Sequence, residues 1–564
     1  MPELTIPLIG PYTTRTIDPW SASSKDQVFK NCFFNAANNS ITKNSSVYIE
    51  KRPGWETNST PAAGSAGRAV YHTPFDNARR IITVFGSTSV TFYSGTTVAG
   101  TATFTGNSTD VLITETVISG TKYIIFGCTG GIYFLPEGAT SVVNFTGDTH
   151  TNTVIDNVSS LTGLYVGQII TGTGIQANTR IATISAPSTI TTTLATTATN
   201  SGVTITHEAV AKIIDADLPG SVCGQVVAMD GYLFTGTTGG LIYNSDLNSI
   251  QNWNALSFIP TSFTSTIGAS VEPFGVWRIK NYIVAMGYQN IEWFTNAGNP
   301  TGSVLSRVQG SAINIGANSM KGVAQVVDDV YFISSESAGT NGVYVIAETS
   351  VQKVSSQIID NILGSATNTN TSSLSAVKFA GNDSLLLTIS QNSAYRSFIY
   401  FKQMNLWFEW DGSIPWTITP STSAFFNNPD SGLGNAALFA VSDLLTTGKV
   451  YSMTMSAPVY QDDGSAYSMI VQSQPYVLNK GKGFVIHSVE LLADNQSSGS
   501  TTLSISRDDY ASFQVLGSFD LTQRRKRIMR GGLCRNHAIF KLEDSGNNAW
   551  RGQALVVNYS PCAT

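Results

Sequence analysis

Short apolar runs that end at Gly, Asp or Asn recur along most of the chain, and this repetition constrains the fold more than any other feature. Residues 122–127 read KYIIFG and are followed by GIYFL at 131–135; residues 282–287 read YIVAMG and are followed by IEWF at 291–294. In each unit, alternating apolar residues meet a short polar turn, and a second run carries an aromatic residue. The pattern predicts pairs of adjacent β-strands.

These units recur at intervals of roughly 40–55 residues, a period typical of β-propeller blades. A blade buries its two faces only against neighbouring blades, so the units are expected to close into a ring. We expect about five to seven blades, and the repeat alone does not fix their number. Helical periodicity is scarce, and residues 355–363 are the best candidate for a helix.

The composition agrees with an all-β chain. Charged residues make up 12% of the 564 residues and hydrophobic residues 42%, whereas an ordinary soluble protein has about 25% charged residues. The apolar content is too high for a disordered chain. Ser, Thr, Asn and Gly fill most of the remainder, which excludes coiled coils and helical bundles and favours many short strands joined by turns.

Two segments depart from the repeat. Between residues 157 and 206 the only charged residue is Arg180, and Thr-rich strands alternate with Gly turns, which indicates a small β domain inserted in a loop. Beyond about residue 461, strand-like runs such as 484–492 and 553–559 predict a compact β-sandwich.

The sequence therefore predicts an all-β fold, namely a β-propeller with an inserted small β domain and a C-terminal β-sandwich-like domain. Its four predicted segments are the N-terminal part of the propeller (1–146), the inserted Thr/Gly-rich β domain (147–208), the remainder of the propeller (209–460) and the C-terminal sandwich with a basic hairpin (461–564).

No pattern of catalytic, cofactor-binding or metal-binding residues stands out. The five Cys and five His are widely scattered, without a CxxC or HExxH spacing. Residues 172–177 match the letters GxGxxA, but β-like residues follow where a dinucleotide site needs a helix. Two adjacent Asp residues occur at 328–329, 462–463 and 508–509, and each pair could act as acid and base or bind calcium. Because adjacent residues on a strand face opposite sides, we favour the interpretation that these Asp residues form turns. We expect no catalytic residue, no cofactor and no metal.

No apolar run reaches the 18 residues of a membrane span, and the first residues lack the basic start of a signal peptide. We therefore expect a chain without a membrane span that is made in a cytoplasm.

Charge is unevenly distributed along the chain. From residue 501 onward there are nine Lys/Arg against five Asp/Glu, or +4, which leaves −9 for the first 500 residues. On a strand, Arg525 and Arg527 would face one side. Arg524 and Lys526 would face the other. One reading of this run is a solvated hairpin; the other is docking to an acidic protein partner or to phosphates, where Arg binds carboxylate or phosphate bidentately.

Base stacking is not expected, because few aromatic residues interleave with the basic ones. A protein partner is favoured over DNA. The candidate docking residues are Arg524, Arg525, Lys526, Arg527, Arg530 and Arg535.

Several motifs, taken in order, resemble one family. They are IPLIGPY at 6–12, NCFFN at 31–35, KRPGW at 51–55, the long stretch 277–294 and RIMRGG at 527–532. Their order and spacing resemble the packaged-DNA stabilisation, or tail nozzle, family of short-tailed bacteriophages. The insertion, with GLYVGQ at 163–168 and GTGI at 172–175, is similar to small β modules of phage tail and fibre proteins.

This resemblance implies a structural component of the phage tail. It implies a homo-oligomeric ring, typically a hexamer, that extends the portal and adaptor conduit, retains packaged DNA and releases it at infection. The implied partners are the adaptor and portal proteins, tail fibres or spikes, and double-stranded DNA in transit. The implied location is the tail of the virion, after synthesis in the host bacterial cytoplasm. An acidic lumen would repel DNA phosphate.

Two other functions stay open at this point. A tail adhesin or fibre adaptor that binds host glycans would expose aromatic platforms. A propeller enzyme such as a glycosidase would gather Asp and Glu in the central funnel, which the scattered acidic residues do not suggest.

Overall fold

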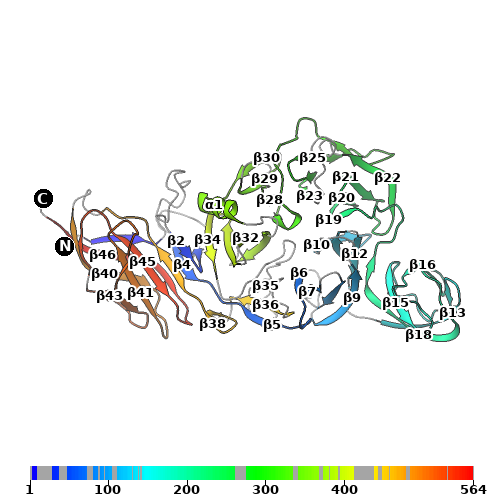
Figure 1. The fold of residues 1–564 in the computed structure, drawn as a ribbon, viewed down its shortest axis with the longest axis horizontal. Helices are drawn as coiled ribbons and strands as arrows, with labels where there is room; N and C mark the ends of the chain where they lie inside the picture. The colour runs from blue at the N-terminus through cyan, green and yellow to red at the C-terminus, as the bar shows by residue number, and fades with distance from the viewer. Residues whose placement is uncertain are drawn as a thin grey trace.

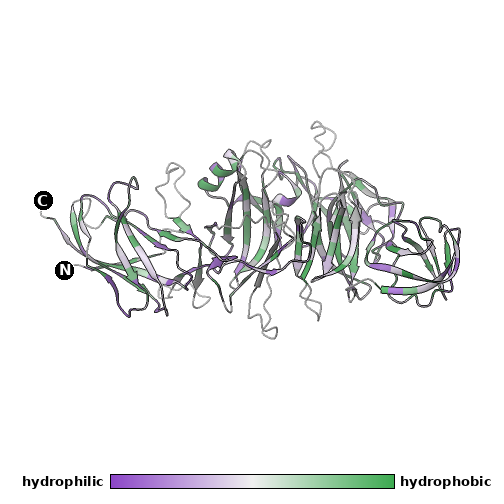
Figure 2. Cartoon of the chain, turned by 60° about the horizontal axis from the view of Figure 1, so that its bottom comes forward, coloured by the Kyte–Doolittle hydropathy of each residue, from purple (hydrophilic) through white to green (hydrophobic). Residues whose placement is uncertain are grey.

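The computed structural model describes most of the chain in a series of segments. These are residues 3–8, 28–36, 47–72, 81–86, 89–94, 96–103, 111–129, 131–137, 139, 143–260, 275–334, 341–366, 372–379, 382–391, 394–411, 437–441, 448–455, 458–477, 483–529 and 531–562. They form three parts in a row: a sandwich, a ring of sheets and a small lateral domain (Figure 1). Figure 2 shows the same row from another side, with apolar segments along the strands.

Seven blades make up the ring within the described residues, so the predicted all-β propeller is confirmed and its blade number is now fixed. Each blade is an antiparallel meander of three or four strands. The first blade contains β6 (Gly67–His72), β7 (Ile81–Gly86), β8 (Ser89–Ser94) and β9 (Thr97–Thr103), and the second contains β10 (Val111–Ile118), β11 (Thr121–Cys128), β12 (Gly131–Pro136) and the end of β18 (Thr199–Lys212). The third contains β19 (Val222–Met229), β20 (Tyr232–Thr237), β21 (Leu241–Ser245) and β22 (Trp253–Pro260), the fourth contains β23 (Gly275–Ile279), β24 (Tyr282–Met286), β25 (Ile291–Asn296) and β26 (Leu305–Arg307), and the fifth contains β27 (Val323–Val326), β28 (Asp329–Ile333), β29 (Val343–Ala347) and β30 (Ser350–Lys353). The sixth contains β31 (Ser373–Phe379), β32 (Asn382–Gln391), β33 (Ala394–Phe401) and β34 (Leu406–Trp410), and the seventh contains β35 (Ala437–Val441), β36 (Val450–Thr454) and β5 (Glu56–Ser59).

The ring closes through its innermost strands. Strand β6 contacts β10, β10 contacts β19, β19 contacts β23, β27 contacts β31, β31 contacts β35, and β35 contacts β6 again. Strand β23 of the fourth blade contacts β28 of the fifth. The seventh blade is completed by β5 from near the N-terminus, which pairs with β36, so the two ends of the propeller sequence are fastened in one sheet.

Apolar side chains between consecutive blades hold the ring together. Phe92 of the first blade packs on Phe126 of the second, with ring centroids 4.6 Å apart. Between the fourth and fifth blades, Trp293 is fully buried and its indole N–H donates to the carbonyl of Glu348 at 2.8 Å. The predicted helix is α1 (Gln357–Ser365), capped by Ser356 and packed on the fifth and sixth blades.

The lateral domain is inserted between the third and fourth strands of the second blade. It consists of β13 (Val143–His150), β14 (Val154–Asp156), β15 (Gln168–Gly172), β16 (Ile181–Ser185), β17 (Thr189–Thr192) and the first part of β18. It has a core of its own, which includes Phe145, Ile170 and Ile205. Because the insertion lies beside the outermost strand of a blade, it stands outside the ring (Figure 1).

Glu208 fastens the base of the insertion to the first blade. Its carboxylate accepts hydrogen bonds from the backbone N–H of Thr101 at 2.8 Å and from the Thr101 hydroxyl at 2.9 Å. Burial raises the pKa of Glu208, although the bonds from Thr101 and the charge of Arg180 oppose the increase.

We expect this carboxyl to make stability depend on pH. The folded state holds the Glu208 proton more tightly than the unfolded state, so the free energy of unfolding falls as pH rises from the ordinary Glu pKa to the raised one. Glu208→Gln should remove that part of the decrease. Chemical denaturation of both chains at a series of pH values measures it, and parallel pH profiles would contradict the assignment.

The sandwich contains two sheets. One contains β1 (Glu3–Pro7), β3 (Cys32–Ala36), β4 (Val47–Lys51), β46 (Arg551–Pro561), β40 (Phe484–Ala493), β43 (Lys526–Ile528) and β44 (Gly532–Cys534). The other contains β2 (Val28–Lys30), β39 (Met469–Gln472), β45 (Ile539–Asp544), β41 (Ser500–Ser506) and β42 (Gln514–Asp520), and β2 also pairs with β34 of the sixth blade. A two-strand hairpin, β37 (Gln461–Asp462) and β38 (Ser465–Ala466), lies beside the junction of the two parts.

The first strands lie in this sandwich and not in the propeller, where residues 1–146 were predicted to belong. Strands β1 and β4 pair with β46, the last strand of the chain. The physical reason is burial: Ile6, Phe33 and Ile49 enter a core that the C-terminal strands form together with the sixth blade. The other predicted segment boundaries remain predictions.

The motif KRPGW at 51–55 marks the point where the chain leaves the sandwich and enters the propeller. Arg52 is fully buried and forms a two-pronged pair with Asp462, at 2.9 Å and 2.7 Å. Lys51 is also buried and donates to Asp544 at 2.7 Å. Arg52 additionally donates to the side-chain oxygen of Asn31 at 3.0 Å and to the carbonyl of Asp411 at 3.0 Å. The contacts of Arg52 therefore fix the joint between the two parts, whereas the Lys51–Asp544 pair joins β4 to β45 within the sandwich.

Gly54 explains why the motif needs a glycine. A Cβ at this position would lie 1.9 Å from the carbonyl oxygen of Gln461, so the backbones would have to separate. We expect Gly54→Ala to lower the free energy of unfolding by about 3 kcal/mol, the upper range for overpacking. Gly220→Ala is the control, because a Cβ there meets nothing within 4 Å. Equal denaturation midpoints for the two variants would refute this account.

Candidate docking surface

The predicted basic residues lie at the outer edge of the sandwich, where β43 and β44 both pair with β40. Strand β43 begins only at Lys526, so Arg524 and Arg525 belong to the preceding turn. Along β43 the side chains alternate: Lys526 and Ile528 are buried and Arg527 is exposed. The alternation predicted for the basic run therefore applies to its second half alone.

Lys526 points into the sandwich and not toward a partner. Its ammonium group donates to the carbonyls of Ala493 and Gln523, each at 3.0 Å, and to the side-chain oxygen of Asn495 at 2.8 Å. Burial lowers the pKa of Lys526, which the charges of Asp494 and Asp520 partly offset. The docking prediction does not hold for this residue, because its donors are already used to tie loops together.

The other predicted arginines that the structure describes are exposed. Arg525 binds both oxygens of Glu490, at 3.0 Å and 2.9 Å, and Arg527 donates to the hydroxyl of Ser488 at 2.8 Å. Arg524 and Arg535 are exposed as well. Arg530 lies outside the described residues. Four of the six predicted side chains are thus exposed, three of them within the turn and strand at 524–527.

Exposed apolar side chains accompany these arginines, and the sequence analysis missed them. Val515, Met529 and Leu533 are 63%, 68% and 56% exposed. Arg507 links their segments, since it donates to Gln514 at 2.6 Å and also to the carbonyl of Gly531. Nothing in the sequence singles out three apolar residues in a chain that is 42% hydrophobic.

We call this surface the basic–apolar edge. It consists of Val515, Arg524, Arg525, Arg527, Met529, Leu533 and Arg535. Arg and Met are enriched where proteins contact one another, and Lys is depleted. The guanidinium groups can bind carboxylates bidentately, and the apolar side chains gain free energy when a partner covers them.

The predicted Asp doublets form turns and one buried ion pair. Asp508 accepts from Ser512 and Ser506, and these hydrogen bonds lower its pKa to about 2. Asp463 is a turn residue with φ of 47°. Asp462 departs from the turn interpretation, because its carboxylate is fully buried against Arg52. In the described part of the chain, no three His, Cys, Asp or Glu side chains gather where they could hold a metal ion.

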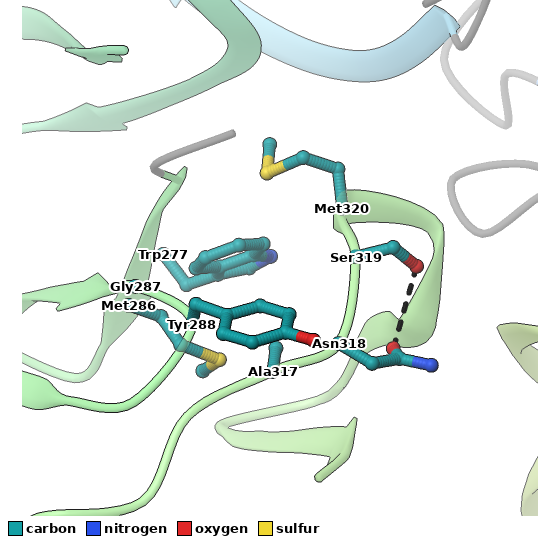
Figure 3. Close-up of a pocket in the computed structure, with 8 residues that line it drawn as sticks. All are labelled: Trp277, Met286, Gly287, Tyr288, Ala317, Asn318, Ser319 and Met320. Atoms are coloured by element: carbon teal, nitrogen blue, oxygen red, sulfur yellow. Dashed lines mark hydrogen bonds between the residues drawn. The ribbon is translucent and has the colours of Figure 1, made fainter. Parts of the chain in front are cut away.

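A small cavity lies between the fourth and fifth blades. Trp277, Met286, Tyr288 and Met320 line it, with Asn318 and Ser319 hydrogen-bonded at its side (Figure 3). Its volume of about 10 Å³ is roughly that of one water position. The cavity is too small for a substrate.

No helix among the described residues has the length and apolarity needed to cross a membrane.

Residues 191–407 match the model of a phage stabilisation family described as "Bacteriophage P22 Gp10, beta-propeller". The match covers less than half of the chain and runs from the end of the insertion into the last strand of the sixth blade. Over these residues it supports the family that the sequence motifs resemble. Among curated proteins, none matches the chain.

Several solved structures are similar to the chain at low identity. BBS1N, in its complex with ARL6DN, is 12% identical, with 72% of this chain and 98% of that chain covered and a TM-score of 0.37. Raptor of Chaetomium thermophilum is 10% identical, with 72% and 30% covered and a TM-score of 0.34. The exo-β-1,3-galactanase of Phanerochaete chrysosporium is 11% identical, with 59% and 95% covered and a TM-score of 0.21. At such TM-scores these similarities carry no argument about function.

Proposed function

We propose that this chain, whose propeller segment belongs to the phage stabilisation family, is a structural component of a bacteriophage tail. In this proposal, copies of the chain form the nozzle or hub, a ring-shaped channel that extends the portal and adaptor conduit. The ring retains packaged DNA and releases it at infection. The observation that carries the proposal is the family match over residues 191–407, which covers most of the blades that build the propeller.

We further propose that the role is non-catalytic and that it is exercised in the virion. The partners in this proposal are further copies of the chain, in a hexamer, together with adaptor or portal proteins and tail fibres or spikes. The basic–apolar edge supports the proposal, because it combines unburied apolar side chains with arginines. The position of the insertion outside the ring suits a contact with fibres or with the host (Figure 1).

Retention of DNA tests this function. Phage assembled without this chain should lose packaged DNA, which a nuclease then degrades, and addition of the purified full chain should restore nuclease resistance. Particles that keep their DNA equally well without the chain would overturn the proposal. Glycan binding by a monomeric chain would instead support a tail adhesin.

A further inference from the structure

The third blade is acidic and has an exposed apolar rim. Residues 213–260 contain four Asp and no Lys or Arg. Asp217, Asp230 and Asp246 are exposed, whereas Asp215 is partly buried and accepts from the backbone N–H of Trp253 at 2.9 Å. Residues 213–260 therefore carry a negative net charge, opposite to that of the residues from 501 onward.

Backbone hydrogen bonds join the segment at 246–248 both to the start of the outer strand and to the β19–β20 turn that holds Asp230. The N–H of Asp246 donates to the carbonyl of Asn252 at 2.8 Å, and the N–H of Asn248 donates to the carbonyl of Gly231, next to Asp230, at 2.8 Å. Leu247 and Leu256 are 56% and 73% exposed. We call Asp217, Asp230, Asp246, Leu247 and Leu256 the acidic–apolar edge.

The outer strand of this blade is also unpaired on one side. Strand β22 ends the four-stranded sheet β19–β20–β21–β22 and pairs only with β21 among the described strands. An exposed sheet edge with apolar side chains is a surface that proteins normally cover or protect with charge. Within residues 213–260 the charges are all negative, and Arg278 of the fourth blade reaches the carbonyl of Ala228 at 3.0 Å.

The two edges lie far apart in the molecule. Strands β40 and β43 are at the sandwich end of the long axis, and β22 is at the other end of the ring, on the side of the insertion (Figure 1). A chain cannot bring its own two edges together across this distance. A neighbouring copy can supply the complementary edge.

We propose that the basic–apolar edge of one copy docks on the acidic–apolar edge of the next copy. This inference rests on the ring of the proposed function and names the surfaces that build it. Arg524 and Arg527 would pair with the aspartates of the acidic–apolar edge. Met529 and Leu533 would cover Leu247 and Leu256. Because different surfaces meet, the contact is head-to-tail, and repeated contacts of this kind close a ring when the rotation allows it.

Charge reversal tests the inference on the full chain. One variant carries Arg524→Glu and Arg527→Glu; the other carries Asp217→Lys and Asp246→Lys. All four side chains are exposed, so both variants should fold, which circular dichroism checks. Sedimentation velocity should show each variant associating at least about 100-fold more weakly than the natural chain, since like charges then face one another.

The decisive measurement is sedimentation velocity of an equimolar mixture of the two variants. Each variant keeps one natural edge and presents one reversed edge, so every contact in an alternating ring again joins opposite charges. The mixture should associate as the natural chain does. The control variant carries Lys280→Glu and Glu348→Lys, which exchange the two charges of an exposed ion pair. Because neither residue lies on either edge, this variant should associate like the natural chain.

Each other outcome overturns the inference in a different way. If the reversed variants still assemble like the natural chain, the assigned surfaces are wrong while the ring of the proposed function stands. If the natural chain is monomeric even when concentrated, the ring fails together with the docking surfaces. If the arginine variant assembles normally but no longer attaches to phage particles, the basic–apolar edge binds a different protein.

Discussion

Replacing Arg52 with methionine is expected to lower the free energy of unfolding by about 3–5 kcal/mol, the cost of leaving one partner of a buried ion pair unpaired. Both side chains of the pair are 0% exposed. Without the guanidinium, the Asp462 carboxylate would lose its two hydrogen bonds from Arg52, at 2.9 Å and 2.7 Å, and would keep the one from the N–H of Trp55, at 3.0 Å. Urea denaturation followed by tryptophan fluorescence measures the change.

A double variant separates loss of the pair from loss of packing. Arg52→Met combined with Asp462→Leu removes both charges, and replacing a whole buried pair with apolar residues is often close to neutral. The double variant should therefore be more stable than Arg52→Met alone. The single variant Asp462→Leu is measured as well. If the double variant loses as much unfolding free energy as Arg52→Met and Asp462→Leu lose in sum, the destabilisation comes from packing and not from the unpaired charge.

Trp410→Ala is the second variant with a large expected effect, about 3–5 kcal/mol of unfolding free energy from the cavity that it creates. The indole is 0% exposed in the core that the sandwich shares with the sixth blade. It packs edge-on against Phe379 at 4.9 Å, and its N–H donates to the carbonyl of Cys32 at 3.0 Å. The loss should be measured by calorimetry or by urea denaturation.

Trp410→Phe serves as the graded control. It keeps an aromatic ring but removes the donor to Cys32, so the expected loss is smaller and comes in part from an unsatisfied carbonyl, about 1–3 kcal/mol. An alanine variant that is no less stable than the phenylalanine variant would show that the core between sandwich and propeller is loosely packed.

The propeller could be predicted from sequence because each blade is a local meander. Adjacent strands such as β24 and β25 are separated by a turn of a few residues, so both the pattern and the pairing are visible in a short window. The closure of the ring by β5 could not be predicted in this way. Its partner β36 lies almost 400 residues further along the chain, and alternation of apolar residues does not specify a distant partner.

The same reasoning explains the placement of the first strands in the sandwich. Their apolar residues indicated strands, but whether Ile6 or Ile49 packs on a blade or on the C-terminal strands depends on tertiary contacts alone. The KRPGW motif carried the resemblance to a family, yet its physical role is structural. Buried Arg52 joins the sandwich to the sixth blade, and buried Lys51 joins the two sheets of the sandwich.

The sequence predicted the basic residues of the candidate docking surface but not which of them are exposed. Of the predicted residues, Arg524, Arg525, Arg527 and Arg535 are exposed. Lys526 differs because the strand begins at that residue and turns it inward. The exposed Val515, Met529 and Leu533 carry no sequence signal, because exposure depends on which strand lies at an edge.

Electron microscopy of the purified full chain, alone and mixed with phage particles that lack the tail tip, tests the central claim most directly. The account predicts rings of several copies with an open centre, and the same rings seated at the portal end of the particles. Single copies that neither form rings nor bind to the particles at any concentration would contradict it.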